Sequence, residues 1–168
     1  MSETDAPRLA DAFPEAAVLG AGLREAGLRV AVAESCTGGL LGAALTASPG
    51  SSDYMRGGVI AYADDLKIAL LGVAAALLEA HGAVSAEVAV AMAEGVRRRL
   101  GADLGIAVTG VAGPSESERK PAGLIFVAVA GPGDVAPRVE RLDRDRGREP
   151  NRAEAVRAAL RLAAGAVG

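Results

Sequence analysis

Short apolar runs with little polar interruption recur along the chain and predict strands that are buried on both faces. The first run, residues 30–33, stops abruptly at polar residues and glycines, after which apolar residues return at helical spacing. We expect the last strand to lie at an edge of the sheet. The expected strands cover residues 30–33, 58–63, 102–108, 124–130 and 138–142.

Segments with apolar residues on one helical face alternate with these strands. The expected helices cover residues 14–26, a segment that begins with Thr37 as its N-cap, and residues 64–71, 74–80, 85–100 and 150–164. The alternation predicts a single three-layer α/β/α sandwich with a mixed, mostly parallel sheet, since adjacent strands at 124–130 and 138–142 imply an antiparallel part. Residues 1–12 show little periodicity, so we expect a loose arm there, followed by one domain over 13–168.

The composition restricts the packing and the ligands of this domain. Hydrophobic residues make up 51% of the 168 residues, but there are only two tyrosines, two phenylalanines and no tryptophan. Small aliphatic residues must therefore fill the core. The net charge of −3 and the few aromatic rings argue against a nucleic-acid surface, which needs clustered Lys and Arg and rings for base stacking. A small-molecule ligand is the remaining expectation.

The cysteine content and the hydropathy pattern indicate the cellular compartment of the protein. A single cysteine excludes an intramolecular disulfide and a cysteine-built metal site. One histidine, His81, makes a histidine-built zinc site unlikely as well, and we expect neither metal nor cofactor. No apolar run is long enough to span a bilayer, and the N-terminus is polar and acidic. We therefore expect a cytoplasmic protein with no membrane partner.

The junction after the first expected strand is the strongest candidate for a ligand site. Ser35, Cys36 and Thr37 stand at the carboxyl end of that strand, where open α/β sheets bind ligands. Gly38 and Gly39 would let an anion approach the N–H groups of a helix N-terminus.

Five ordered blocks of residues follow one another along the chain. They are Glu-Ser-Cys-Thr-Gly-Gly at 34–39, Gly-Gly-Val-Ile-Ala-Tyr at 57–62 with Lys67, His-Gly-Ala-Val-Ser at 81–85, Val-Thr-Gly-Val-Ala-Gly-Pro at 108–114 and Lys-Pro-Ala-Gly at 120–123. Together these blocks resemble the C-terminal domain of the competence-damage-inducible protein CinA, also found alone as nicotinamide-nucleotide amidase. The resemblance runs from about residue 13 to about 165. It implies a mixed-sheet fold and hydrolysis of the carboxamide of nicotinamide mononucleotide.

Amide hydrolysis needs a nucleophile, a base and donors for the oxyanion. Ser35 is the leading nucleophile through the resemblance, although a serine at such a turn is often only a cap. Cys36 is the rival, because a thiol at a helix N-terminus can have a lowered pKa, but chain alternation favours a small buried side chain under the turn.

Lys67 and Tyr62 are the candidates for the base. A lysine desolvated in an apolar pocket can lose its proton near neutral pH, whereas a surface helix lysine stays charged. Tyr62 could relay a proton or stack on a pyridine ring, or it could be an ordinary tyrosine at a strand end. His81 is expected at a helix C-terminus, where a structural role is favoured over general-base catalysis.

A second junction repeats the logic of the first, with Thr109 and Gly110 at the end of a buried strand. Thr109 could position Ser35 or donate to the oxyanion, and the backbone of Gly110 and Gly113 could approach a phosphate; a simple turn is the alternative.

Three further residues are candidates for substrate contact. Arg148 and Arg152, one helical turn apart, could clamp the phosphate. Ser51, in a turn cluster, becomes a possible ligand contact only through the resemblance.

Two departures from the family pattern bear on affinity and specificity. Residues 115–119 read Ser-Glu-Ser-Glu-Arg, where the family usually has a glycine-rich loop, and Glu116 could oppose an anion there. Arg146-Gly147 precedes Arg148, where Gly-Asp is common.

The resemblance as a whole predicts an amidase that acts on a small nucleotide. We expect a homo-oligomer, most simply a dimer. The alternative is a nucleotide-binding or regulatory module of the same fold without turnover.

Overall fold

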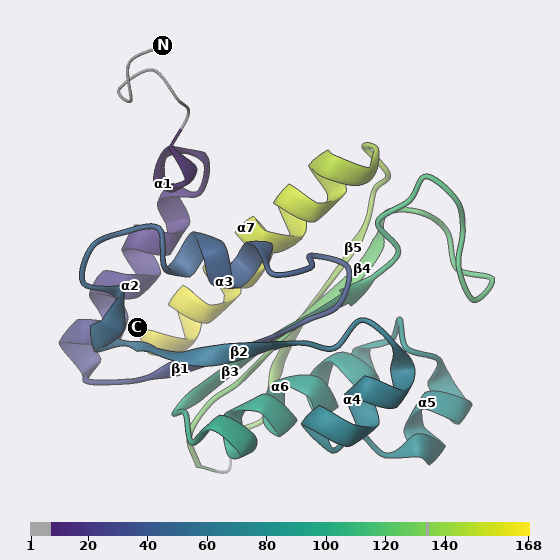
Figure 1. The fold of residues 1–168 in the computed structure, drawn as a ribbon, viewed down its shortest axis with the longest axis horizontal. Coiled ribbons are helices and arrows are strands. Elements are labelled where there is room, and N and C mark those ends of the chain that lie inside the picture. Colours follow the sequence, from purple (N-terminus) through teal and green to yellow (C-terminus); the bar gives the residue numbers. More distant parts are fainter. Residues whose placement is uncertain (1–7, 134) are drawn as a thin grey trace.

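The computed structural model describes residues 8–133 and 135–168, which form a mixed sheet between two layers of helices (Figure 1). The strands lie in the order β2-β1-β3-β4-β5. Strand β1 pairs in parallel with β2 and β3, whereas β4 runs antiparallel to both β3 and β5. This confirms the expected three-layer α/β/α sandwich with a mixed sheet. The strand bounds are β1 (Val30–Glu34), β2 (Met55–Ile60), β3 (Leu104–Gly110), β4 (Leu124–Ala130) and β5 (Arg138–Asp143).

The helices lie on both faces of this sheet. Helices α1, α2, α3 and α7 lie on one face, and α4, α5 and α6 lie on the other (Figure 1). Their bounds are α1 (Leu9–Ala12), α2 (Pro14–Ala26), α3 (Leu40–Leu45), α4 (Asp64–Leu71), α5 (Ala75–His81), α6 (Ala86–Leu100) and α7 (Arg148–Val167), and a 3₁₀ turn η1 (Ser51–Asp53) precedes β2. In the described ranges, no helix has the length and apolar character that crossing a membrane requires.

The two faces of the sheet use side chains of different size. Strand β1 directs Val32 into the core beneath α2, α3 and α7, and it directs Ala33 into the core beneath α6. Helix α6 lies close to the sheet, because a Cβ added to Gly105 would stand 2.0 Å from the carbonyl oxygen of Ala93. Small residues on that face therefore let α6 pack directly against the strands, as the aromatic-poor composition indicated.

The expected bounds differ most from the structure in two places. The second strand covers Met55–Ile60 rather than 58–63, because pairing of Met55 with Val30 extends it toward the N-terminus despite two glycines with weak strand propensity. The expected loose arm contains α1 at Leu9–Ala12, whose C-terminal end is fixed by Phe13, which is buried under α7 with the Arg157 guanidinium 5.3 Å from its ring. Residues 1–7 of that arm lie outside the described residues.

Candidate active site

A cavity of about 290 Å³ opens at the carboxyl ends of β1, β2 and β3. This is the edge at which the sequence predicted a ligand site, and the volume suits a small molecule. Its lining comes from both predicted junctions, from α4, from the α5–α6 turn, from the β3–β4 loop and from the first residue of α7. The lining residues are Ser35, Cys36, Tyr62, Asp64, Lys67, Ala83, Val84, Thr109, Gly110, Val111, Ala112, Gly113, Ser115, Ser117, Glu118 and Arg148.

Ser35 lies at the floor of this cavity, directly after β1. Its main chain is fixed, since its N–H donates to the carbonyl oxygen of Val108 at 3.0 Å and its carbonyl accepts from the N–H of Gly38 at 3.1 Å. The side chain is 8% exposed, and among the described residues its hydroxyl forms no hydrogen bond. The hydroxyl is therefore available to a ligand in the cavity, on a backbone that is fixed.

The buried carboxylate of Glu34 caps helix α3, a role that the sequence analysis gave to Thr37. The Glu34 oxygens accept from the N–H groups of Gly39, Leu41 and Gly42 at 3.0, 3.0 and 2.8 Å. Gly39 is the N-cap residue, with a left-handed φ of 103°. The expected anion site at this helix N-terminus is therefore wrong, because an internal carboxylate already takes those N–H groups.

Cys36 is buried in the core beneath the turn, as chain alternation predicted. Burial raises the pKa of its thiol from 9.0 to about 12, despite the opposing effect of Arg152 and Arg148. The lowered pKa considered for a rival nucleophile is therefore wrong. The Cys36 side chain is therefore a protonated, apolar thiol at neutral pH.

Lys67 reaches the cavity from α4 and is only 1% exposed. Its Nζ donates to the carbonyl oxygen of Tyr62 at 2.9 Å and lies 3.3 Å from Oδ1 of Asp64. The solvated-lysine alternative is thereby excluded. Asp64 was not predicted as a site residue, although its position three residues before Lys67 on one helix was a usable signal.

Tyr62 also lines the cavity, but its side chain is 59% exposed. Its main-chain carbonyl, rather than its hydroxyl, holds Lys67. The structure brings Ser35, Lys67 and Tyr62 to one cavity, as predicted.

At the second junction, the Thr109 hydroxyl donates to the carbonyl oxygen of Ala83 at 2.8 Å. This hydrogen bond fixes the α5–α6 turn, which forms part of the cavity wall. The Thr109 hydroxyl therefore does not make the expected donation to an oxyanion. Gly110 is required by packing, since an added Cβ would stand 2.5 Å from Cγ1 of Ile125 on β4. The N–H groups of Ala112 and Gly113, in contrast, donate to no main-chain group of the described chain, so they can stabilise an oxyanion in the cavity.

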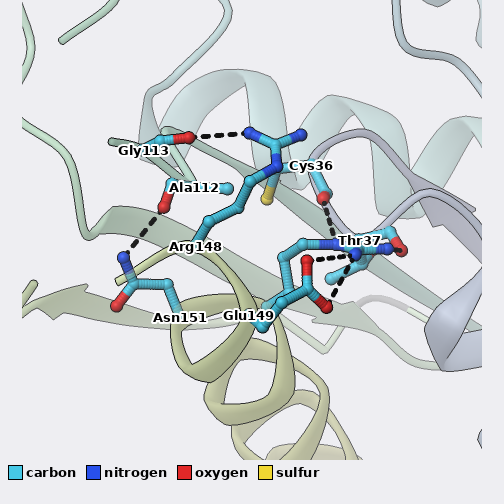
Figure 2. Close-up of polar contacts among 8 residues, drawn as sticks. Cys36, Thr37, Ala112, Gly113, Arg148, Glu149 and Asn151 are labelled. Carbon is cyan, nitrogen blue, oxygen red and sulfur yellow. Dashed lines mark hydrogen bonds and ion pairs between the residues drawn. The ribbon is translucent and has the colours of Figure 1, made fainter. Parts of the chain in front are cut away.

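Arg148 and Arg152 stand one turn apart on α7 but do not form a common clamp. Arg152 donates to the carbonyl oxygens of Cys36 and Thr37 at 3.2 and 3.0 Å, and it pairs with Glu149 at 2.9 Å. Arg148 turns the other way, donates to the carbonyl oxygen of Gly113 at 2.7 Å and lines the cavity (Figure 2). Arg152 is therefore a support for the Ser35 turn, and Arg148 alone can contact a ligand.

Asn151 holds the loops on either side of Arg148. Its buried side-chain amide donates to the carbonyl oxygen of Ala112 at 2.9 Å (Figure 2) and to the carboxylate of Asp145 at 2.9 Å. The bond from Asn151 lowers the pKa of the Asp145 carboxyl. No pattern in the sequence distinguished this asparagine from a helix-surface residue.

Other predicted ligand contacts lie outside the cavity. Thr37, Gly38 and Gly39 are held under the turn by Arg152 and Glu34, and the buried Thr37 hydroxyl has no partner among the described residues. Ser51 precedes β2, whereas the cavity lies past its carboxyl end, about 20 Å away for a six-residue strand.

Residues 115–119, which differ from the family pattern, line the cavity through Ser115, Ser117 and Glu118, and not through Glu116. The acidic residue expected to face the ligand is therefore two positions further along. His81 lies outside the cavity lining, with Nδ1 3.6 Å from a carboxylate oxygen of Glu87.

A model of the CinA C-terminal domain matches residues 13–167. The chain belongs to the CinA C-terminal domain family. A CinA-like protein of Gloeobacter violaceus is 54% identical over 137 residues, which cover 81% of this chain and 32% of the relative. A CinA-like protein of a Synechococcus species is 56% identical over 141 residues, covering 83% and 34%. The chain thus spans about a third of the length of these curated relatives.

Solved CinA-family structures match over nearly their whole length. The competence damage-inducible protein A of Klebsiella pneumoniae is 35% identical with a TM-score of 0.87, covering 92% of this chain and 95% of that one. A CinA-superfamily protein of Enterobacter cloacae is 29% identical with a TM-score of 0.88, covering 100% and 97%. The five-stranded α/β/α domain described here is thus the CinA C-terminal fold.

Proposed function

We propose that this CinA-family domain, residues 13–168, hydrolyses the carboxamide of nicotinamide mononucleotide to nicotinate mononucleotide and ammonia. The observation that carries the proposal is the buried Lys67 in the same small cavity as the free hydroxyl of Ser35. The resemblance to stand-alone nicotinamide-nucleotide amidases supplies the substrate class. The proposal takes a small nucleotide as the partner and the cytoplasm as the compartment.

In the first half-reaction of this proposal, the Ser35 oxygen forms a bond to the carboxamide carbon and its proton passes to the side-chain nitrogen of Lys67, which acts as the base. The N–H groups of Ala112 and Gly113 donate to no main-chain group of the described residues, and we assign them to the oxyanion. The carbon–nitrogen bond then breaks, the proton on Lys67 moves to the leaving nitrogen, and ammonia departs. An acyl ester on Ser35 is left.

In the second half-reaction, water attacks the ester with Lys67 again as base, and Ser35 is restored as the carboxylate product leaves. Arg148 is suited to the substrate phosphate, because its guanidinium faces the cavity and donates to only one carbonyl, that of Gly113.

A nucleotide-binding module without turnover is the second candidate. It is favoured by the contacts of Lys67, whose Nζ serves as a donor to Tyr62 and Asp64 in this structure. A lysine that keeps these contacts when the cavity is filled would hold a ligand without accepting a proton from Ser35.

One experiment separates the two candidates. The purified protein is incubated with nicotinamide mononucleotide, and released ammonia and the thermal shift are both measured, with Ser35→Ala as control. Ammonia from the wild type alone supports the amidase. A thermal shift without ammonia supports the binding module, and neither signal would reject nicotinamide mononucleotide as the ligand.

A further inference from the structure

The β3–β4 loop ends in a tight turn that holds an acidic side chain at the cavity. Ser117 and Lys120 exchange main-chain hydrogen bonds, from N–H to carbonyl oxygen, at 3.0 and 2.8 Å. The two residues between them, Glu118 and Arg119, have φ values of 53° and 61°. Two successive left-handed residues with β-carbons are unfavourable, since such turns prefer Asn-Gly or Gly-Gly. Strained backbone of this kind is concentrated at functional sites in proteins.

The Glu118 carboxylate lies over the α5–α6 turn in the cavity wall. A Cβ added to Gly82 would stand 2.8 Å from Oε2 of Glu118 and 3.0 Å from Nζ of Lys120. Lys120 in turn donates to the carbonyl oxygens of His81 and Val84. The absent side chain at Gly82 therefore leaves room for the Glu118 carboxylate and for the Lys120 ammonium beside it.

Two charged groups of the cavity form no ion pair among the described residues. Lys67 and Asp64 pair with each other, whereas Arg148 bonds only a carbonyl and Glu118 has no cationic partner within ion-pair distance. A carboxylate is an acceptor only, so a ligand that satisfies Glu118 must bring donors. Ribose hydroxyls are such donors, and a carboxylate binds them in dinucleotide-binding folds. A phosphate would be repelled there and suits Arg148 instead.

We propose that Glu118 is a specificity-determining residue that accepts hydrogen bonds from the ribose hydroxyls of the substrate. This inference rests on the proposed function for the identity of the nucleotide. It assigns the carboxamide to Ser35, the sugar to Glu118 and the phosphate to Arg148. The chain therefore selects ribonucleotides over their deoxy analogues.

The test measures binding in the Ser35→Ala chain by calorimetry, so that turnover does not interfere. The probes are nicotinamide mononucleotide and its 2′-deoxy analogue. Glu118→Ala should weaken the ribonucleotide about tenfold, the usual weight of a hydrogen bond to a charged group. The deoxy analogue should bind about tenfold more weakly to the parent, and Glu118→Ala should change its affinity less than about twofold.

Glu116→Ala is the matched control, because Glu116 carries the same charge on the same loop outside the cavity lining. It should leave both affinities within about twofold, as expected for a screened surface charge. Glu118→Gly removes the same carboxylate and relieves the backbone strain, so it should bind like Glu118→Ala with a higher melting temperature. This pair separates loss of the carboxylate from damage to the loop.

Several results would overturn the inference. Equal weakening of both ligands would place Glu118 at another part of the substrate, and tighter binding of the ribonucleotide would mean that the carboxylate repels the phosphate. No change, or no binding by the parent, would also reject it. Ammonia release by the wild type tests the proposed function separately, since ribose selection without ammonia would leave this inference standing and remove the amidase.

Discussion

The junctions after β1 and β3 look alike in sequence, because each ends a buried strand with a small hydroxyl residue and nearby glycines, yet the structure uses them in opposite ways. After β1, the turn backbone is held by Glu34 and Arg152, and the Ser35 hydroxyl is left free. At the end of β3, the Thr109 hydroxyl donates to Ala83, and the N–H groups of Ala112 and Gly113 in the following loop donate to no main-chain group of the described residues.

This difference divides the chemistry between the two junctions. In the proposed mechanism, the first junction supplies the nucleophile on a rigid turn, and the second supplies donors for the developing oxyanion. Neither set alone can hydrolyse an amide, so their meeting in one cavity with Lys67 is what supports the amidase proposal.

The largest expected effect comes from removing the free hydroxyl. Ser35→Ala should lower kcat for nicotinamide mononucleotide by about 10³-fold or more, because the acyl ester can no longer form. Thermal shift measurements should show that the variant still binds the nucleotide. If Ser35→Ala keeps most of the wild-type kcat, the Ser35 hydroxyl is not the nucleophile.

The thiol beside Ser35 should be almost inert. With a pKa of about 12 rather than 9.0, the native thiolate fraction at pH 8 is about 10³-fold below that of the unfolded chain. Iodoacetamide should therefore label the native protein at least about 10³-fold more slowly than the protein in denaturant.

The same raised pKa has a consequence for stability. The contribution of the buried neutral thiol is fully present below pH 9 and is lost as the pH rises toward 12. Cys36→Ala should keep turnover and lose this dependence in alkaline unfolding curves. Fast native labelling together with loss of activity would transfer the nucleophile to Cys36.

Lys67 links the two junctions as the proposed base. Lys67→Met keeps most of the buried aliphatic chain, removes the amine and should lower kcat about 10²-fold, with a smaller change in KM. Tyr62→Phe is the control, because Lys67 bonds the main-chain carbonyl of Tyr62, and this variant should be milder. A Lys67→Met variant that keeps most of its kcat would remove the lysine from the mechanism.

The smallest expected effects separate the two arginines of α7. Arg148→Met should raise KM for nicotinamide mononucleotide about tenfold and leave KM for nicotinamide riboside unchanged, since only the nucleotide carries a phosphate. Arg152→Met should lower the free energy of unfolding by about 2 kcal/mol, because two turn carbonyls lose their donor. The same KM response in both variants would contradict their assigned roles.

Local patterns were sufficient for the fold and for the edge of the sheet that carries the cavity. Apolar periodicity located each strand and long helix, and the carboxyl-edge rule placed Ser35 and Thr109 in one pocket, whereas Lys67 was singled out only by the family resemblance. The errors concern side chains whose partners are distant in sequence. Arg152 reaches main-chain atoms 115 and 116 residues earlier, which no local spacing reveals.

Glu34 shows a second limit of sequence reading. A carboxylate inside a buried strand was not considered as a cap, because caps are normally sought just before the helix and Thr37 filled that position. The strand places Glu34 below the turn, where its oxygens reach three N–H groups at once. Glu118 was missed for a related reason, since the direction of a loop side chain depends on left-handed backbone that the sequence did not indicate.

The most direct test of the account is to trap the ester itself. Wild-type protein is mixed with nicotinamide mononucleotide, quenched in acid within the first turnover, and analysed by peptide mass spectrometry. An acyl ester on Ser35 should add a mass equal to the nucleotide minus ammonia to the peptide that carries this serine. Fragmentation should place the added mass on the serine oxygen, and Ser35→Ala should show no gain. Ammonia release with the adduct on Cys36, or ammonia release with no adduct on any peptide, would contradict the acyl ester on Ser35.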